Sequence, residues 1–300
     1  MRIVRGLAPA ALAVLALCGC SGDDPADPPA PGRDPVVHRL TSNDSYEANP
    51  VYSPDGAWIL FERDTAGNRD LWRMPAGGGP AERLTDDPAF DTAADWSPDG
   101  TRVVFESDRD GYKGLWVIDL AAAVPAAVRL GGGAWDDGDP AWSPDGGRIA
   151  FNSNRTGNQE VWLAHLDGSP PRQLTAVGPG AYARTPDWSP AGDSIACESN
   201  REGASALWLV DADTGAMTRL TPEHGYEGHP AWSPDGAEIA CESTRSGTME
   251  IWVVPAAGGE MFQVTTAGGH WPRWSPDGTS IVYCAFGTGE PDVWSVEVDW

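Results

Sequence analysis

Ser97-Pro98-Asp99-Gly100 is the stretch of sequence that decides the fold, because copies of it recur along the chain. Ser-Pro-Asp-Gly begins again at Ser53, Ser143, Ser233 and Ser275, and a variant, Ser-Pro-Ala-Gly, begins at Ser189. Consecutive copies start 44, 46, 46, 44 and 42 residues apart, which is the period of a four-stranded propeller blade. The chain is therefore predicted to be one unit repeated six times.

Aromatic residues keep the same spacing within every copy. A Tyr or Trp precedes each tetrapeptide, and a Trp follows that residue after 20 positions. The pairs are Tyr52/Trp72, Trp96/Trp116, Trp142/Trp162, Trp188/Trp208, Trp232/Trp252 and Trp274/Trp294. These positions set the register of the strands in each repeat.

The segments between these markers have the patterns of β-strands. The tetrapeptide makes a tight turn between a first and a second strand, because Pro fixes φ and Gly can adopt a positive φ. Alternating apolar residues, as in 102–106, predict the second strand, and 250–254 is typical of the third. The fourth strand ends in Leu-Thr or a near copy, as at Leu84-Thr85.

The sixth copy stops at Trp300 without a fourth strand, while residues 36–41 form an unassigned strand of that type before the first copy. We expect this segment to pair into the last blade, because an open ring would expose strand edges. The predicted fold class is all-β: a six-bladed β-propeller of four-stranded antiparallel blades, closed by an N-terminal strand.

The repeat Pro-x-Trp-Ser-Pro-Asp-Gly, followed by Ile-x-Phe-x-Ser-x-Arg, Ile-Trp and Leu-Thr, resembles that of the TolB-type, WD-like β-propeller family over residues 36–300. The resemblance implies the fold and leaves the activity open, because this architecture serves binding proteins, lyases and peptidase domains. It also implies a periplasmic partner of the peptidoglycan-associated lipoprotein kind. TolB itself has a preceding α/β domain, for which residues 21–35 are too short, so the resemblance covers the propeller alone.

The N-terminal residues predict export and anchoring. Arg2 and Arg5 precede an apolar run from Leu7 to Leu17, which is typical of a signal peptide. The following Leu-Cys-Gly-Cys resembles a bacterial lipobox and predicts lipidation of Cys20, with residues 1–20 as the signal; ordinary signal cleavage is the alternative. Residues 21–35 are predicted to be a flexible tether. The expected location is the periplasmic side of the envelope, with the outer membrane favoured.

The charge limits the classes of partner. The chain has 44 acidic and 20 basic residues, a net charge of −24, and loss of Arg2 and Arg5 with the signal lowers it to −26. Nucleic acids and anionic lipid headgroups require basic residues, so basic proteins or cations are the favoured partners, although solubility also explains the charge. No Cys spacing predicts a disulfide or zinc site. Cys197 and Cys241 replace Phe in the second strand and are expected to be buried.

Candidate binding residues lie on one face of the ring. Strand direction places the loops that enter each blade on the same face as the loops between the second and third strands; we call this the loop face. The entering loops carry an aromatic residue with a carboxylate in most copies, a combination suited to protein or sugar contacts. The candidates are Tyr46, Glu47, Phe90, Asp91, Trp135, Asp137, Tyr182, Tyr226, Glu227 and Trp271. The alternative is that the aromatics fill gaps between blades.

Four arginines occupy one matched position on the loop face, and we expect them to form structural ion pairs or hydrogen bonds that link blades: Arg109, Arg155, Arg201 and Arg245. Asp139, His229 and His270 are weak candidates for a metal site, because related lyases hold a metal in the channel with several His residues. The acidic cluster at residues 136–139 is a weak Ca²⁺ candidate. The prediction is no cofactor, with Ca²⁺ or Mn²⁺ as the alternative.

The function predicted from these observations is a non-catalytic, monomeric envelope lipoprotein whose propeller binds a protein or cell-wall partner. The alternative from another class is a carbohydrate-binding protein or a metal-dependent glycan lyase, and a structural repeat protein without a ligand is a third. A serine peptidase would require a separate α/β domain with its nucleophile, for which no residues remain after the sixth copy.

Overall fold

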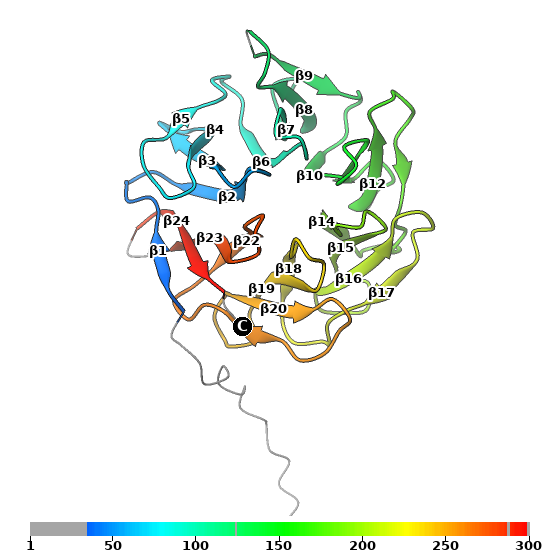
Figure 1. The fold of residues 1–300 in the computed structure, drawn as a ribbon. Coiled ribbons are helices and arrows are strands. Elements are labelled where there is room, and N and C mark those ends of the chain that lie inside the picture. The colour runs from blue at the N-terminus through cyan, green and yellow to red at the C-terminus, as the bar shows by residue number, and fades with distance from the viewer. Residues whose placement is uncertain (1–34, 124, 287–288, 299–300) are drawn as a thin grey trace, which may run out of the picture. The chain divides into compact units, whose positions relative to one another are not determined.

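A computed structural model describes residues 35–123, 125–286 and 289–298 of the protein. Within these ranges every regular element is a strand, and the strands form six four-stranded antiparallel sheets around a central opening (Figure 1). The structure confirms the predicted fold class, an all-β propeller with six blades.

The blades follow one another along the chain, and each has its first strand nearest the central opening (Figure 1). Blade 1 contains β2 (Glu47–Tyr52), β3 (Trp58–Thr65), β4 (Asn68–Pro75) and β5 (Glu82–Arg83). Blade 2 contains β6 (Asp91–Trp96), β7 (Arg102–Ser107), β8 (Gly114–Asp119) and β9 (Ala127–Leu130). Blade 3 contains β10 (Asp137–Trp142), β11 (Arg148–Ser153), β12 (Glu160–His165) and β13 (Arg172–Gln173).

The second half of the ring repeats this order. Blade 4 contains β14 (Ala183–Trp188), β15 (Ser194–Ser199), β16 (Ala206–Asp211) and β17 (Met217–Arg219). Blade 5 contains β18 (Glu227–Trp232), β19 (Glu238–Ser243), β20 (Glu250–Pro255) and β21 (Phe262–Gln263). Blade 6 contains β22 (His270–Trp274), β23 (Ser280–Phe286) and β24 (Pro291–Glu297), with β1 (Val37–Arg39) as its fourth strand.

The N-terminal strand closes the ring as the sequence predicts. β1 pairs antiparallel with β24, with Val37 opposite Val296. The amide of Leu40 donates to the carbonyl of Val293 at 2.9 Å and extends the pairing. Because β1 covers the outer edge of β24, blade 6 has four strands like the other blades and β24 is not an exposed edge strand.

The repeated tetrapeptide forms the turn between the first two strands of each blade. In blade 2 the Ser97 hydroxyl donates to Asp99 at 2.6 Å and accepts the amide of Arg102 at 2.9 Å, while Gly100 has a φ of 69°. In blade 4 Ala replaces the Asp, and Asp193 accepts the bond from Ser189 at 2.9 Å instead. The variant copy therefore keeps the turn by moving its carboxylate two residues along.

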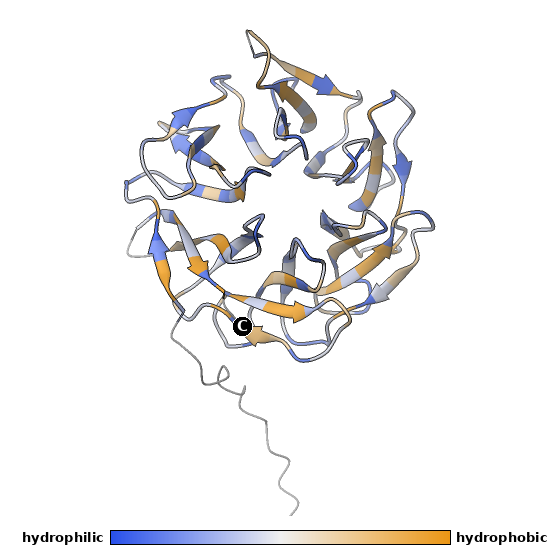
Figure 2. Ribbon diagram, viewed as in Figure 1, coloured by the Kyte–Doolittle hydropathy of each residue, from blue (hydrophilic) through white to orange (hydrophobic). Residues whose placement is uncertain are grey.

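The hydrophobic core lies between neighbouring blades. Apolar residues of blade 1 pack with those of blade 2, for example Leu71 and Phe105, and equivalent clusters follow around the ring. One cluster joins blade 6 to blade 1 through Val282 and Phe61, so the closure also buries apolar surface. Figure 2 shows hydrophobic residues along the strands and hydrophilic residues in the turns.

The cysteines of the second strands are buried and unpaired, as predicted. Cys197 and Cys241 oppose Trp208 and Trp252 at the place where Phe105 opposes Trp116 in blade 2. Burial raises the pKa of both thiols, so neither provides a reactive thiolate.

The predicted signal peptide, the lipidation site at Cys20 and residues 21–34 of the predicted tether lie outside the described residues. No helix among the residues that the structure describes is long and apolar enough to cross a membrane.

Candidate functional site: the central channel and its loop face

Each innermost strand has a bulge at the same place. One residue per blade has a φ between 45° and 51° there, and the strand pairing shifts around it. These bulge residues are Asn49, Ala93, Asp139, Thr185, His229 and Trp271. A positive φ is uncommon outside glycine, and strongly so for a β-branched or bulky residue. Such strain, repeated six times, marks the bulge ring as a candidate functional feature.

The bulge ring lines the central channel. All six bulge residues line one cavity, together with the residues that follow them, among which are Val51 and Arg273. Five of the six are followed by Pro, which cannot donate a hydrogen bond to the sheet and fits the interrupted pairing. The bulge position therefore contributes a different side chain to the channel lining in every blade.

A second ring lies on the second strands, directly after the residue that opposes the tryptophan. Four blades carry a buried Glu at this position, and the set is Glu62, Glu106, Asn152, Glu198, Glu242 and Cys284. Sequence reasoning did not single out these residues, although a Glu within an otherwise apolar strand was the available signal. Burial of a carboxylate is costly unless it is paired or hydrogen-bonded.

Two of these glutamates bind the bulge of the next blade. Glu62 accepts the amide of Ala93 at 2.7 Å, and Glu242 accepts the amide of Trp271 at 2.7 Å. Burial raises the pKa of Glu62. Burial also acts to raise the pKa of Glu242, but the charge and hydrogen bond of His229 outweigh it and lower that pKa. These carboxylates hold neighbouring bulges together across the blade boundary.

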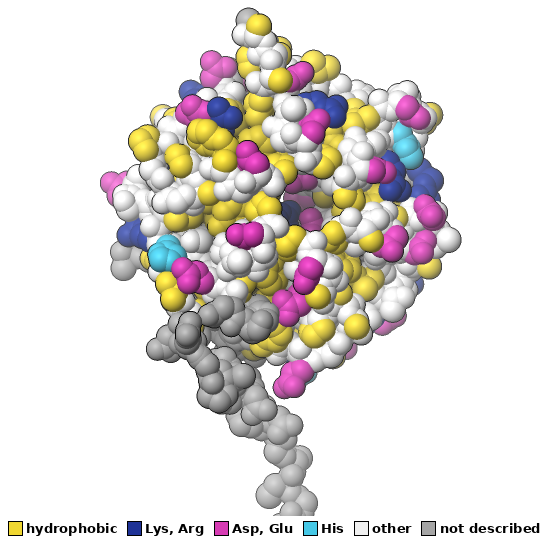
Figure 3. Space-filling model, viewed as in Figure 1, with side chains coloured by type: hydrophobic (Ala, Val, Ile, Leu, Met, Phe, Trp, Pro, Cys, Tyr) yellow, Lys and Arg dark blue, Asp and Glu magenta, His cyan; other side chains and the backbone are white. Residues whose placement is uncertain are grey.

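The other two glutamates are held by side chains at the loop face. Lys113 donates to Glu106 at 2.6 Å. Glu198 accepts Arg184 at 2.5 Å and the Tyr226 hydroxyl at 2.8 Å. Burial, with the charge of Asp139 as the second cause, raises the pKa of Glu106 to about 6. The wall of the channel thus holds several carboxylates in ion pairs and hydrogen bonds, and Figure 3 shows acidic and basic side chains inside its opening.

The predicted loop-face carboxylates lie inside the blades. Asp91 pairs with Arg109 through two hydrogen bonds of 2.7 and 2.8 Å. Equivalent ion pairs join Asp137 to Arg155 at 2.7 Å and Glu227 to Arg245 at 3.3 Å. Three of the four predicted ion pairs therefore exist, but each joins the first residue of an innermost strand to a loop of the same blade and does not link blades.

Blades 1 and 4 depart from this pattern. In blade 1 Glu47 pairs with Arg63 at 2.6 Å, because Thr65 occupies the usual arginine position. In blade 4 Ala183 replaces the acid, and Arg201 lies over the ring of Trp208 at 5.1 Å. The four arginines also have in common that each lies over the third-strand tryptophan of its own blade.

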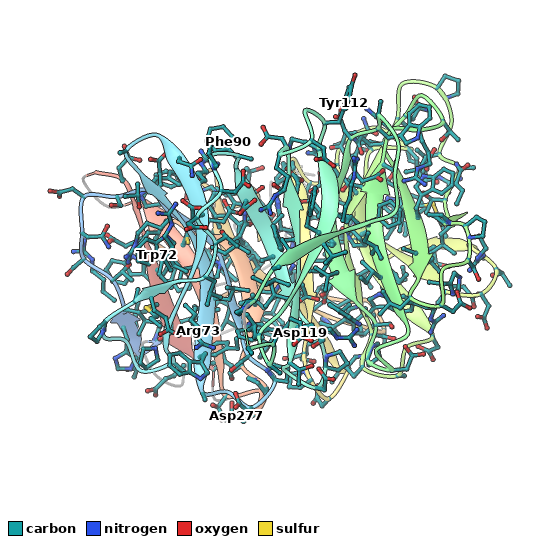
Figure 4. All side chains as sticks on the ribbon, turned by 90° about the horizontal axis from the view of Figure 1, so that it is seen from above. Trp72, Arg73, Phe90, Tyr112, Asp119 and Asp277 are labelled. Carbon is teal, nitrogen blue, oxygen red and sulfur yellow. The ribbon has the colours of Figure 1, made fainter. Side chains whose placement is uncertain are left out.

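The candidate aromatics separate into two groups. Phe90 and Trp135 are 48% and 45% exposed, and Tyr112 of the neighbouring loop is 52% exposed. Figure 4 shows Phe90 and Tyr112 at the loop face, opposite Asp119 and Asp277. The remaining predicted aromatics are partly buried at the channel mouth or among its charges: Tyr46, Tyr182, Tyr226 and Trp271. The aromatic ring predicted from sequence is therefore an exposed patch on blades 2 and 3 and a set of partly buried rings elsewhere.

The far end of the channel has its own half-buried carboxylates. Asp95 and Asp187 accept the amides of Trp142 and Trp232, each at 2.7 Å, and so connect blade 2 to blade 3 and blade 4 to blade 5. Burial raises the pKa of Asp95 to about 6, and Arg273 acts against this. Burial also raises the pKa of Asp187.

Comparison with known families decides the relationship. The sequence profile described as TolB beta propeller domain matches residues 86–184 and 140–299. The chain belongs to this family. A second profile, the Tricorn protease N-terminal beta propeller domain, matches residues 30–115 of the same TolB propeller.

Solved structures share the fold of this TolB propeller at low sequence identity. A putative TolB from Agrobacterium tumefaciens is 19% identical, with a TM-score of 0.66 over 88% of this chain and 97% of that chain. TolB from Acinetobacter baumannii is 19% identical, with a TM-score of 0.67, and the match covers 86% of this chain and 65% of that one. An oligogalacturonate lyase from Vibrio parahaemolyticus is 14% identical, with a TM-score of 0.61 over 88% and 93%.

The metal candidates of this TolB propeller are only partly brought together. His229 and His270 both approach Glu242, at 3.4 and 3.8 Å. In the described parts of the chain, no three His, Cys, Asp or Glu side chains are grouped as a metal ion would require, so Asp139 does not complete such a set. In the acidic cluster, Asp136 binds Asn154 at 2.9 Å and Asp137 binds Arg155.

Proposed function

We propose that this protein is a non-catalytic recognition module of the bacterial cell envelope, which binds a protein partner through the loop face of its TolB propeller. The observation that carries the proposal is the exposure of Phe90, Tyr112 and Trp135. Figure 4 shows the first two on the loop face, and Trp135 lies in the loop that enters blade 3. Large aromatic side chains are enriched at the centres of protein interfaces. The channel carboxylates, by contrast, are mostly occupied in hydrogen bonds and ion pairs that stabilise the ring.

The three aromatic residues belong to connected loops. The amide of Phe90 binds Asp108 at 3.0 Å in the loop that carries Tyr112. The carbonyl of Lys113, at the end of that loop, accepts the amide of Asp137 at 3.3 Å, two residues after Trp135. These bonds hold the aromatics on a fixed frame, which favours a preformed docking surface.

The proposal is tested by comparing three forms of the protein as bait for envelope proteins of the source bacterium, with quantification of each recovered protein. The double variant Phe90→Ser/Trp135→Ser removes two exposed aromatics. Val128→Ser is the matched control, because Val128 is 66% exposed on the outer strand β9. We expect a protein that is recovered with the parent and the control and is lost with the double variant. Equal recovery with all three forms would overturn the proposal.

Anchoring through Cys20 on the periplasmic side, with the outer membrane favoured and a peptidoglycan-associated protein as partner, completes the proposal. The support is the lipobox-like sequence before Ser21 and the family membership. Metabolic labelling with a radioactive fatty acid should label the parent and fail to label Cys20→Ser. Labelling of Cys20→Ser, or soluble behaviour of the parent, would contradict it. We also propose that the propeller is monomeric, which light scattering of the purified protein tests.

A glycan lyase is the competing proposal, favoured by the pair His229 and His270 beside Glu242 in the channel. It predicts that the protein releases unsaturated sugars from acidic glycans when Mn²⁺ or Ca²⁺ is supplied, and that His229→Gln abolishes the release. Absence of product under these conditions favours the recognition module.

A further inference from the structure

A polar cavity opens where the channel meets the loop face. It has a volume of about 340 Å³, within the range of sites that bind small groups. We call it the mouth cavity. Carboxylates, an amide and an aromatic ring contribute to its lining, and those used below are Glu62, Glu106, Asp139, Asn152 and Trp271.

The basic side chains of the mouth cavity already have partners. Lys113 binds Glu106 at 2.6 Å, and Arg184 binds Glu198 at 2.5 Å. The Arg69 guanidinium lies over the ring of Tyr46 at 4.2 Å. Lys113 and Arg184 are therefore paired with carboxylates, whereas Arg69 has a cation–π contact and acts electrostatically on Glu62. Four acidic and three basic side chains line the cavity, so its net charge is negative.

Asp139 is the carboxylate that remains. It is the bulge residue of blade 3, half-buried, with a φ of 45°. Among the described residues, no hydrogen bond or ion pair of its carboxylate is found. Its charge acts on Glu106, whose pKa is raised mainly by burial, and on Lys113, whose pKa is raised mainly by Glu106. An unpaired negative charge thus lies at the floor of the mouth cavity, next to the channel axis.

Asn152 supplies a second acceptor without a donor. It takes the glutamate position in blade 3 and is 8% exposed. Its Nδ2 donates to Gln159 at 3.1 Å, whereas its Oδ1 is buried and receives no hydrogen bond. A buried acceptor left without a donor is unfavourable, and such groups are rare without a ligand or water to satisfy them.

Gly138 keeps these acceptors close together. A Cβ atom at this position would lie 2.3 Å from Glu106 Oε2 and 3.4 Å from Asn152 Oδ1. Any other residue would displace the Glu106 carboxylate, whereas Asn152 Oδ1 would stay at contact distance. The carboxylate of Glu106, the amide oxygen of Asn152 and the adjacent Asp139 therefore surround one corner of the cavity with hydrogen-bond acceptors.

We propose that the mouth cavity binds an organic cation, namely the ammonium or guanidinium group of a lysine or arginine side chain on the partner. An ammonium has three N–H donors and no acceptor, which matches a corner that offers acceptors and an unpaired negative charge. Trp271 in the wall supplies an aromatic surface of the kind that attracts cations. The inference rests on the proposed function in that a protein carries the cation, and the strongly acidic chain favours a basic partner.

The test uses small probes, so that no partner is needed. Binding of Nα-acetyl-lysine amide and Nα-acetyl-arginine amide to the full protein is measured by calorimetry, beside the uncharged norleucine and glutamine amides. Asp139→Asn removes the charge without adding backbone strain, because Asn tolerates a positive φ better than most residues. Asp108→Asn is the matched control: it removes one charge from the same face outside the cavity and retains an acceptor for Phe90.

We expect the two cationic amides to bind the parent and Asp108→Asn equally, and Asp139→Asn to bind them at least about tenfold more weakly, as loss of a close charge in a partly buried site implies. Asn152→Asp, which adds a carboxylate to the same corner, should strengthen binding. Equal binding of cationic and uncharged amides, no binding at all, or no effect of Asp139→Asn would overturn the inference. Each of these results leaves the aromatic docking surface untouched, because that surface is tested separately with Phe90 and Trp135.

Discussion

Replacing Asp95 by Asn should stabilise the propeller. Asp95 lies in the half of the channel away from the loop face, near the turns of the repeated tetrapeptide. Burial raises the pKa of its carboxyl from 3.8 to about 6. A difference of this size corresponds to about 3 kcal/mol that disfavours the ionised form in the folded state. Asn retains the oxygen that accepts the amide of Trp142 at 2.7 Å, and Arg273 retains Asp187 as a nearby carboxylate. The ionised carboxylate is thus the main quantity removed.

The dependence on pH gives this prediction its sign. Because folding raises the pKa of Asp95, the ionised carboxylate lowers stability above about pH 6, and this penalty disappears as the pH falls toward 3.8. Asp95→Asn should therefore increase the free energy of unfolding by up to about 3 kcal/mol at pH 8 and have little effect near pH 4. Urea unfolding followed by tryptophan fluorescence at both pH values measures the difference.

Asp187→Asn is a matched comparison in blade 4 and should give a gain of the same sign, because burial raises that pKa too. The reasoning would be refuted if Asp95→Asn lowered stability at pH 8, or if its effect were the same at pH 8 and pH 4. The first result would mean that the attraction of Arg273 outweighs desolvation at this site, and the second would mean that ionisation of Asp95 does not contribute to the effect.

Three further changes test other parts of the structure. Arg109→Ala leaves Asp91 buried without its cation and should lower the free energy of unfolding by about 3–5 kcal/mol, measured by chemical unfolding. Arg201→Ala should lower it clearly less, because Ala183 stands in place of the acid in blade 4, and similar losses for the two variants would contradict the ion-pair argument. Asp99→Asn should lower the melting temperature at pH 7, because the Ser97 hydrogen bond lowers the pKa of Asp99 to about 2. Since folding lowers this pKa, the difference in melting temperature between variant and parent should vanish as the pH falls from about 4 to 2, and a difference that persists at pH 2 would contradict the prediction. Deleting residues 36–41 removes β1 and exposes β24, which should produce oligomers in light scattering through edge pairing; a monomer of unchanged stability would show that closure does not depend on this strand.

The repeat made the fold predictable, because its constraints are local and occur six times. The tetrapeptide specifies a turn by its own hydrogen bonds, and the tryptophan 20 residues after the aromatic specifies which strands pair. Closure by residues 36–41 followed from a missing strand at one end and an extra strand at the other. Each inference needed only spacing and residue type.

The site was less predictable, because its defining features arise from packing between blades. The bulge ring has a different residue in every copy, and the signal that the copies share is the Pro that follows the bulge in five of them. That Pro indicates the repeat but not the conformation of the residue before it. Asp91 looked like a surface acid beside the exposed Phe90, and its burial became evident only with Arg109 placed against it. The glutamates of the second strands did carry a signal: Glu106 and Glu242 are charged residues within strands that are otherwise buried. Weighing them as channel residues would have located the cavity.

At the bulge ring, the side chain that lines the channel can vary while the backbone conformation stays the same. Its backbone conformation is the same with Asn, Ala, Asp, Thr, His or Trp in place, so the bulge itself requires no particular side chain. Each repeat thus contributes one channel-lining side chain from a backbone position of fixed conformation. A library randomised at these six codons would vary the lining of one pore while leaving the turns, the tryptophan pairs and the closing strand unaltered. Selection from such a library offers a route to channels with new ligand preferences on an unchanged architecture.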